Sequence, residues 1–224
     1  QQQAGLGVSE GGWLAAVNYI GYLSGAILAS QISDLKLKDR LFRIGLIVAV
    51  ITTLGMGLTE QFWLWALLRY FAGLSSAAGL LLGSGLILNW LIRHEHRSEL
   101  GIHFIGLGMG IVFCSLAVEL LDGLLDWREQ WFFLSFMGIL ILIPSWRWLP
   151  RPTSGNLTTN GKTLIDNPPS QAFLRIFMWA YFCAGVGYVV SATFIVAIIN
   201  QTPGLEGKGA WAFIILGLAA APAC

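Results

Sequence analysis

Hydrophobic residues fill the chain in long runs that short polar segments separate. Four runs reach or approach the roughly 20 residues that a helix needs to cross the hydrocarbon core of a membrane, namely Gly12–Ser33, Phe62–Ile92, Leu100–Val118 and Ile176–Asn200. Two shorter runs, Ile44–Thr59 and Trp131–Trp146, contain no charged residue, and another begins after Lys208. The pattern predicts six membrane-spanning helices and the start of a seventh.

The composition agrees with that of a membrane protein. Hydrophobic residues make up 56% of the sequence and charged residues 11%, whereas a soluble domain carries about 25% charged residues. The net charge of +1 gives no reason to expect a nucleic acid partner. We therefore expect an all-α, polytopic membrane helix bundle whose surroundings are the lipid bilayer.

Basic residues alternate between the connecting segments. They are frequent in the first, third and fifth connections, at Lys36, Lys38, Arg40, Arg43, Arg93, Arg97, Arg147, Arg151, Lys162 and Arg175. The intervening connections contain only Arg128 and Lys208. Since cytoplasmic loops of membrane proteins are enriched in Lys and Arg, we expect the chain to start outside, with the basic connections in the cytoplasm.

A polar segment rich in Pro, Gly, Asn and Thr divides the chain at residues 149–171. This composition predicts a cytoplasmic linker between an N-terminal helix bundle, residues 1–148, and the start of a C-terminal bundle, residues 172–224. The run Gln2–Trp13 is similar to Gln201–Trp211, which follows a helix. We therefore expect a bundle truncated at both ends, with its first helix missing.

Arg69 is the one Lys or Arg within a hydrophobic run. Steps of three and four residues place it on one helix face with Ala72, Gly73 and Ser76. An arginine in a membrane helix is costly and usually faces a cavity or a partner. Three roles remain open for Arg69: contact with a solute or proton relay, a structural ion pair or cap, and snorkelling to the outer surface.

Other polar side chains in the hydrophobic runs are candidates for the same site. Asn18 and Tyr22 share a face of the first helix and can serve as solute ligands or as interhelical hydrogen bonds. His103 can handle protons or simply be hydrated near a helix end. Tyr181 and Tyr188 can form a half-polar wall or ordinary packing.

The sequence lacks the patterns of several other chemistries. Gly106 and Gly110 lie in an apolar run with no strand before them, which favours close helix packing over a phosphate loop. His94 and His96 lie in a short charged turn, and the cysteines have no paired spacing. We therefore expect no enzyme, no cofactor and no metal site.

Several segments resemble the major facilitator superfamily. They are the basic connection after the first run, the Arg-x-x-x-Gly of LLRYFAGLSSAAG, the glycine-rich GIHFIGLGMGI and the long linker. The segments GGWLAAVNYIGYLSGAILAS and YFCAGVGYVVSATFIVAI resemble its YbfB-like subgroup of bacterial transporters. The resemblance implies a fragment with helices two to seven and part of helix eight of twelve, in a bacterial plasma membrane.

The resemblance also implies roles for individual residues. Asp34, Asp39 and Arg40 fall in the segment that gates conformational change in the family, although Ser30 replaces the usual glycine and Leu35 follows the first Asp. Arg69 falls where the family links an arginine to solute or proton coupling. The glycine-rich helix lacks the proline of the antiporter signature, so exchange is not favoured over symport or uniport.

These observations predict a secondary transporter that moves a small solute by alternating access. Its partners are the solute and the bilayer, and a coupling proton is left open. Two alternatives fit the number of helices: a heptahelical receptor, and a structural membrane protein that transports nothing.

Overall fold

The computed structural model describes residues 5–97, 100–149, 151–152, 169–205 and 208–220, and the elements in these ranges are helices, with no strand. The helices are α1 (Val8–Ser30), α2 (Leu35–Leu58), α3 (Phe62–Ala77), η2 (Ala78–Leu82), α4 (Gly83–Arg93), α5 (Gly101–Leu121), α6 (Trp127–Trp148), α7 (Gln171–Gln201) and α8 (Gly209–Ala220). In the described part, 6 helical spans are long and apolar enough to cross a membrane, with α3, η2 and α4 counted as one. The structure confirms the all-α polytopic bundle.

Two helices begin well before their hydrophobic runs. The run that starts at Ile44 predicts too short a helix, because α2 begins at Leu35 and takes in the basic segment. Asp34 caps α2 by accepting a hydrogen bond from the Lys36 amide at 3.0 Å. At α6, Asp126 and Glu129 form a capping box, so the helix begins at Trp127. Capping residues, and not hydrophobicity, fix these starts.

The span Phe62–Arg93 is interrupted by a π-helical segment. From Ala78 to Leu82 the hydrogen bonds skip one residue more than in an α-helix, which widens the turn that joins α3 to α4. This segment packs against both α1 and α2.

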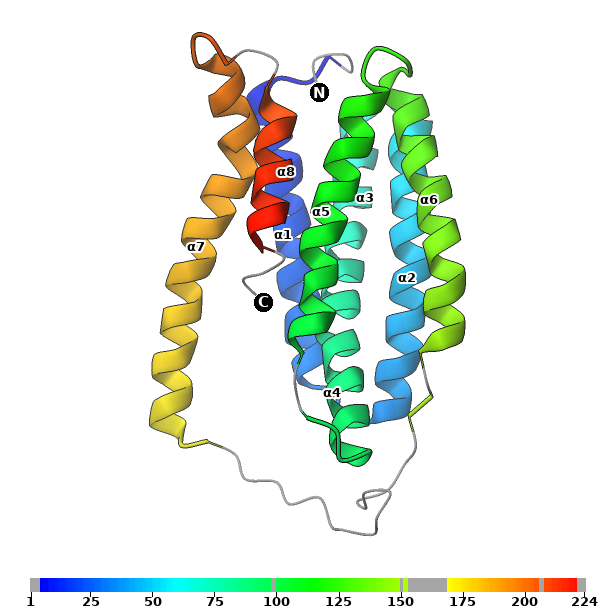
Figure 1. The fold of residues 1–224 in the computed structure, drawn as a ribbon, viewed down its shortest axis with the longest axis vertical. Coiled ribbons are helices and arrows are strands. Elements are labelled where there is room, and N and C mark those ends of the chain that lie inside the picture. The colour runs from blue at the N-terminus through cyan, green and yellow to red at the C-terminus, as the bar shows by residue number, and fades with distance from the viewer. Residues whose placement is uncertain (1–4, 98–99, 150, 153–168, 206–207, 221–224) are drawn as a thin grey trace.

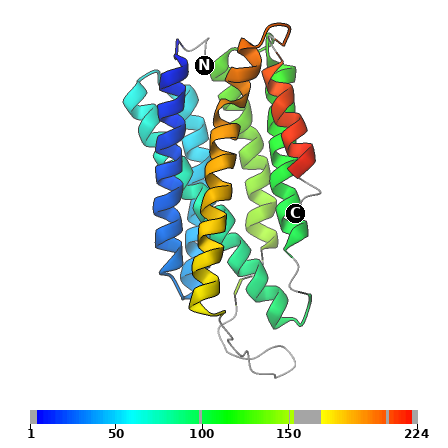
Figure 2. The same cartoon turned by 90° about the vertical axis from the view of Figure 1, so that its left-hand side faces the viewer.

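The helices form two groups that meet along the bundle (Figures 1 and 2). In the first group, α1 lies along α3, while α2 packs between α3 and α6. In the second, α8 packs against α5 and is joined by α7, which also touches α1. Elements from both sides of residues 149–171 are therefore in contact through α5 and α8.

Small residues set the close approach of α5 and α8. A Cβ on Gly217 would lie 2.8 Å from the backbone oxygen of Gly108. The predicted packing pair was Gly106 and Gly110, but in the described part no heavy atom of another element lies within 4 Å of a Cβ built on either. The packing face of α5 is therefore the one that contains Gly108.

Large apolar side chains cover the outside of the bundle. Trp63, Ile102 and Trp148 are each 82% exposed. Such a surface is stable in hydrocarbon but not in water. A small core of Leu14, Met56 and Trp65 lies inside, where the Trp65 Nε1 donates to the Met56 carbonyl at 3.1 Å.

Most of the predicted linker lies outside the described residues, so the division into 1–148, 149–171 and 172–224 stays a prediction.

Candidate functional site

The candidate site begins at the crossing of α1 and α3. Gly73 lies so close to α1 that a Cβ there would be 1.9 Å from the Asn18 carbonyl oxygen. Gly21 makes the reciprocal approach, with a Cβ position 2.0 Å from the Tyr70 carbonyl oxygen. Since neither residue has a side chain, the two backbones touch. This contact brings Asn18 and Arg69 to the same part of the bundle.

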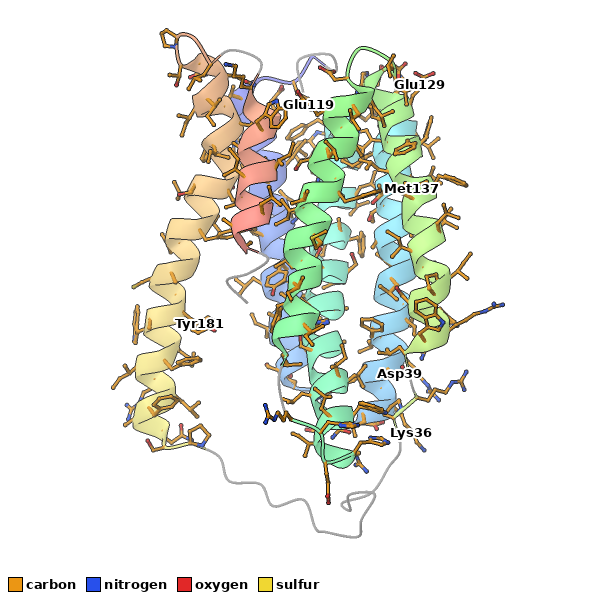
Figure 3. The ribbon with its side chains drawn as sticks, viewed as in Figure 1. Lys36, Asp39, Glu119, Glu129, Met137 and Tyr181 are labelled. Carbon is orange, nitrogen blue, oxygen red and sulfur yellow. The ribbon has the colours of Figure 1, made fainter. Side chains whose placement is uncertain are left out.

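Beside this crossing lies a cavity of about 290 Å³. Residues from α1, α2, α3 and α6 line it, and those that matter for its chemistry are Asn18, Tyr19, Trp65, Arg69 and Trp131. The lining residues Trp127 and Trp131 are each two residues from Glu129, which Figure 3 shows at the end of the bundle opposite Lys36. The cavity offers a positive charge, an amide, a phenol and indole rings.

Arg69 is held in the cavity by an aromatic ring. Its guanidinium carbon lies 5.3 Å from the centre of the Trp131 ring, a distance at which a cation and a ring attract each other. In the described part of the chain, Arg69 has neither an ion pair nor a side-chain hydrogen bond. Within the described residues, the hydrogen-bond donors of the guanidinium are therefore unused.

Tyr19 connects this cavity with α7. Its hydroxyl lies 3.0 Å from the Thr193 hydroxyl, a hydrogen-bond distance. Nearby, a Cβ on Gly12 would lie 3.8 Å from the Phe194 ring. A residue that lines the cavity thus also holds the C-terminal half of α7 against α1.

The remaining candidates lie away from the cavity. Tyr22 is half-buried beside Gly73 but does not line the cavity. His103 lies 3.2 Å from the Ser84 hydroxyl, where α5 approaches α4. Tyr181 and Tyr188 on α7 are 68% and 54% exposed, and Figure 3 shows Tyr181 far from the labelled residues of α6. The structure brings together only Asn18 and Arg69 from the predicted set.

The predicted gating residues lie at the opposite end of the bundle, where Figure 3 shows Asp39. Asp34 caps α2, Arg40 is exposed, and Asp39 is buried in an ion pair with Arg43 at 3.0 Å. Arg43 also donates to the carbonyls of Trp146 at 2.7 Å and Leu149 at 3.2 Å. Asp39 and Arg43 thus connect the start of α2 to the end of α6.

Sequence reasoning missed three residues of the cavity. Trp65 lies four residues before Arg69, so helical spacing from Arg69 points to it, whereas Tyr19 is adjacent to Asn18 and neighbouring residues of a helix do not share a face. Trp131 gives no such signal, because a tryptophan near a helix end serves equally well at the membrane interface. Its position over Arg69 depends on the packing of α6, for which the sequence contains no signal.

One of three comparisons with known proteins found a match. The family model described as "Uncharacterised MFS-type transporter YbfB" matches residues 1–224. No curated protein and no solved structure matches the chain.

Proposed function

Because this chain belongs to the family of YbfB-like transporters of the major facilitator superfamily, we propose that it moves a small anionic solute across a bacterial plasma membrane. Family membership favours a membrane transporter over the heptahelical receptor and the structural protein that the helix number alone allows.

The observation that carries the proposal is the Arg69 guanidinium in the cavity. A charge in a membrane protein is costly unless it has a partner or a function, and the described residues offer Arg69 only the Trp131 ring. A carboxylate, phosphate or sulfonate group matches the donors of a guanidinium. Asn18 and Tyr19, which line the same cavity, would add hydrogen bonds to the rest of the solute.

The contact between α1 and α7 supports alternating access as the mechanism. Tyr19 and Thr193 close the bundle beside the cavity, whereas most residues of α7 from Gln171 to Tyr188 are exposed. A change in the tilt of α7 would alter which end of the cavity is open. Two bundles that rock about a central site work in this way.

Transport currents measured with a panel of solutes test the proposal. We expect proteoliposomes of the wild-type protein to respond to at least one small carboxylate, phosphate or sulfonate. Arg69→Ala should lower that response roughly tenfold to a hundredfold, because a hydrogen bond to a charged group contributes about 1.5–3 kcal/mol. Membrane insertion should not change.

Arg128→Ala is the matched control. Arg128 is also an arginine, but it pairs with Glu60 near the end of the bundle and does not line the cavity. Its removal should leave the response to the same solute within about twofold. A response confined to cations, or one that Arg69→Ala leaves intact, would contradict the proposal.

A further inference from the structure

A second hollow lies on the outside of the bundle, between α1 and α2. Its volume is about 140 Å³, and its walls include Leu28 and Ala29 of α1 and Ile44 and Val48 of α2. Leu28 is 56% exposed and Ile44 is 54% exposed, so the walls reach the surface of the protein. We call this hollow the α1/α2 groove.

The groove exists because α1 and α2 pack mainly against a common third helix. Both contact α3 and η2, and neither makes comparable contact with the other. Gly25 would place a Cβ 2.6 Å from the Ala77 Cβ, and Gly45 would place one 2.8 Å from the Ala78 Cβ. At these close approaches α1 packs against α3 and α2 packs against η2, which form the base of the groove. The space between α1 and α2 remains open.

The groove is suited to a hydrocarbon chain. Ser75 supplies the one side-chain hydroxyl among its lining residues, and that hydroxyl already donates to the Ala72 carbonyl at 2.8 Å. No described side chain therefore presents an unused polar group to the groove. An acyl chain can fill it without leaving a donor or acceptor unpaired.

Positive charge lies at one end of the groove. Leu41, which lines the groove, follows Lys38 by three residues and Arg40 by one, at the start of α2. In the described part of the chain, neither Lys38 nor Arg40 has a side-chain hydrogen bond or an ion pair. The nearby carboxylates are engaged, because Asp34 caps the helix and Asp39 pairs with Arg43.

We propose that the α1/α2 groove binds one anionic phospholipid, with an acyl chain along Leu28, Ile44 and Val48 and the phosphate headgroup at Lys38 and Arg40. Basic pockets between membrane helices bind acidic headgroups. The occupant is lipid and not a transported solute, because the groove opens to the outside of the bundle and is separate from the Arg69 cavity.

Native mass spectrometry with added lipid tests the proposal without any transport measurement, so its outcome does not depend on the proposed solute. Phosphatidylglycerol and phosphatidylcholine with identical acyl chains serve as probes. We expect the wild-type protein to retain one phosphatidylglycerol molecule at least tenfold more strongly than phosphatidylcholine. Equal retention of the two lipids would overturn the proposal.

Two variants with matched charge locate the headgroup. Lys38→Gln with Arg40→Gln should lower phosphatidylglycerol retention roughly 25-fold, since each base near an acidic headgroup contributes roughly fivefold in affinity. Lys36→Gln with Arg147→Gln removes the same charge from exposed residues that do not neighbour a groove residue on α2. The control pair should retain the lipid as the wild type does, and equal losses in both pairs would contradict the assignment.

A third variant tests the acyl chain. Ala29→Phe adds a ring to the wall of the groove and should reduce lipid retention. Melting temperature in detergent without added lipid shows that each variant is folded. If a folded Ala29→Phe protein retains phosphatidylglycerol as the wild type does, the groove does not hold the acyl chain and the proposal fails.

Discussion

Arg43 shows how much one side chain can connect in this protein. It binds the Asp39 carboxylate on its own helix and two carbonyls at the end of α6, and its guanidinium carbon lies 5.1 Å from the centre of the Trp146 ring. The last carbonyls of a helix have no partner within the helix and carry partial negative charge. Arg43 therefore satisfies groups that would otherwise need water at the surface of the membrane.

Replacing Arg43 with glutamine should destabilise the fold. The change leaves a buried Asp39 carboxylate without its cation, and we expect the free energy of unfolding to fall by about 2–4 kcal/mol. Thermal unfolding in detergent, followed by tryptophan fluorescence, measures the effect as a lower melting temperature.

Arg40→Gln is the control on the same helix. Arg40 is exposed, so its replacement should change stability by no more than about 0.5 kcal/mol. Equal melting temperatures for the Arg43 and Arg40 variants would show that the ion pair and hydrogen bonds of Arg43 contribute nothing to stability.

Residues of the site differ in how far the sequence reveals them. Arg69 and Asn18 could be predicted, because charged and amide side chains are rare in membrane helices. Tyr19 and Trp131 could not be assigned to the cavity, because aromatic residues serve equally well at the membrane interface. The hydrogen bonds of Arg43 could not be predicted either, since their acceptors are backbone carbonyls 103 and 106 residues away in the chain.

Among the elements, the crossing of α1 and α3 depends on glycine. The face with Ala72, Gly73 and Ser76 is evident from helical spacing, and small residues on it favour close packing. The structure gives the reason at Gly73, where a Cβ would overlap the Asn18 carbonyl oxygen. The π-helical turn of η2 was not predictable, because a change in hydrogen-bond spacing has no signature in hydropathy.

Gly73→Ala should force α1 and α3 apart. Overpacking of this kind lowers the free energy of unfolding by about 1–3 kcal/mol. We therefore expect a lower melting temperature in the same fluorescence assay. Gly85→Ala on α4 is the matched control, because no heavy atom of another described element lies within 4 Å of its Cβ position. The control should be neutral or slightly stabilising, since alanine favours a helix. An equal loss in both variants would argue against a specific crossing at Gly73.

At the scale of the whole molecule, the hydrophobic runs predicted the number of spans. Hydropathy cannot show which helices become neighbours, because lipid and another apolar helix are similar environments. The pairing of α5 with α8 through Gly108 and Gly217 is therefore a result of the structure. The two ends of the bundle also differ in charge, with Lys36 at one end and Glu129 at the other (Figure 3).

Cysteine labelling in whole cells should reveal this difference. We expect Lys38→Cys to react only after the membrane is made permeable, and Asp126→Cys to react in intact cells, because the positive-inside rule places the basic end in the cytoplasm. The native cysteines, Cys114, Cys183 and Cys224, are replaced by serine first. Labelling of both positions from one side would contradict the alternating spans.

The π-helical segment has a consequence for how the chain tolerates changes in length. Each hydrogen bond of η2 encloses one residue more than an α-helical bond, so a deletion of one residue within Ala78–Leu82 can be absorbed by conversion to regular α-helix. Arg69 would still face the cavity and Ser84 would still face His103. The same deletion in the uninterrupted turns of α3 would rotate the two side chains relative to each other. Natural variation in chain length within this span is therefore expected at η2.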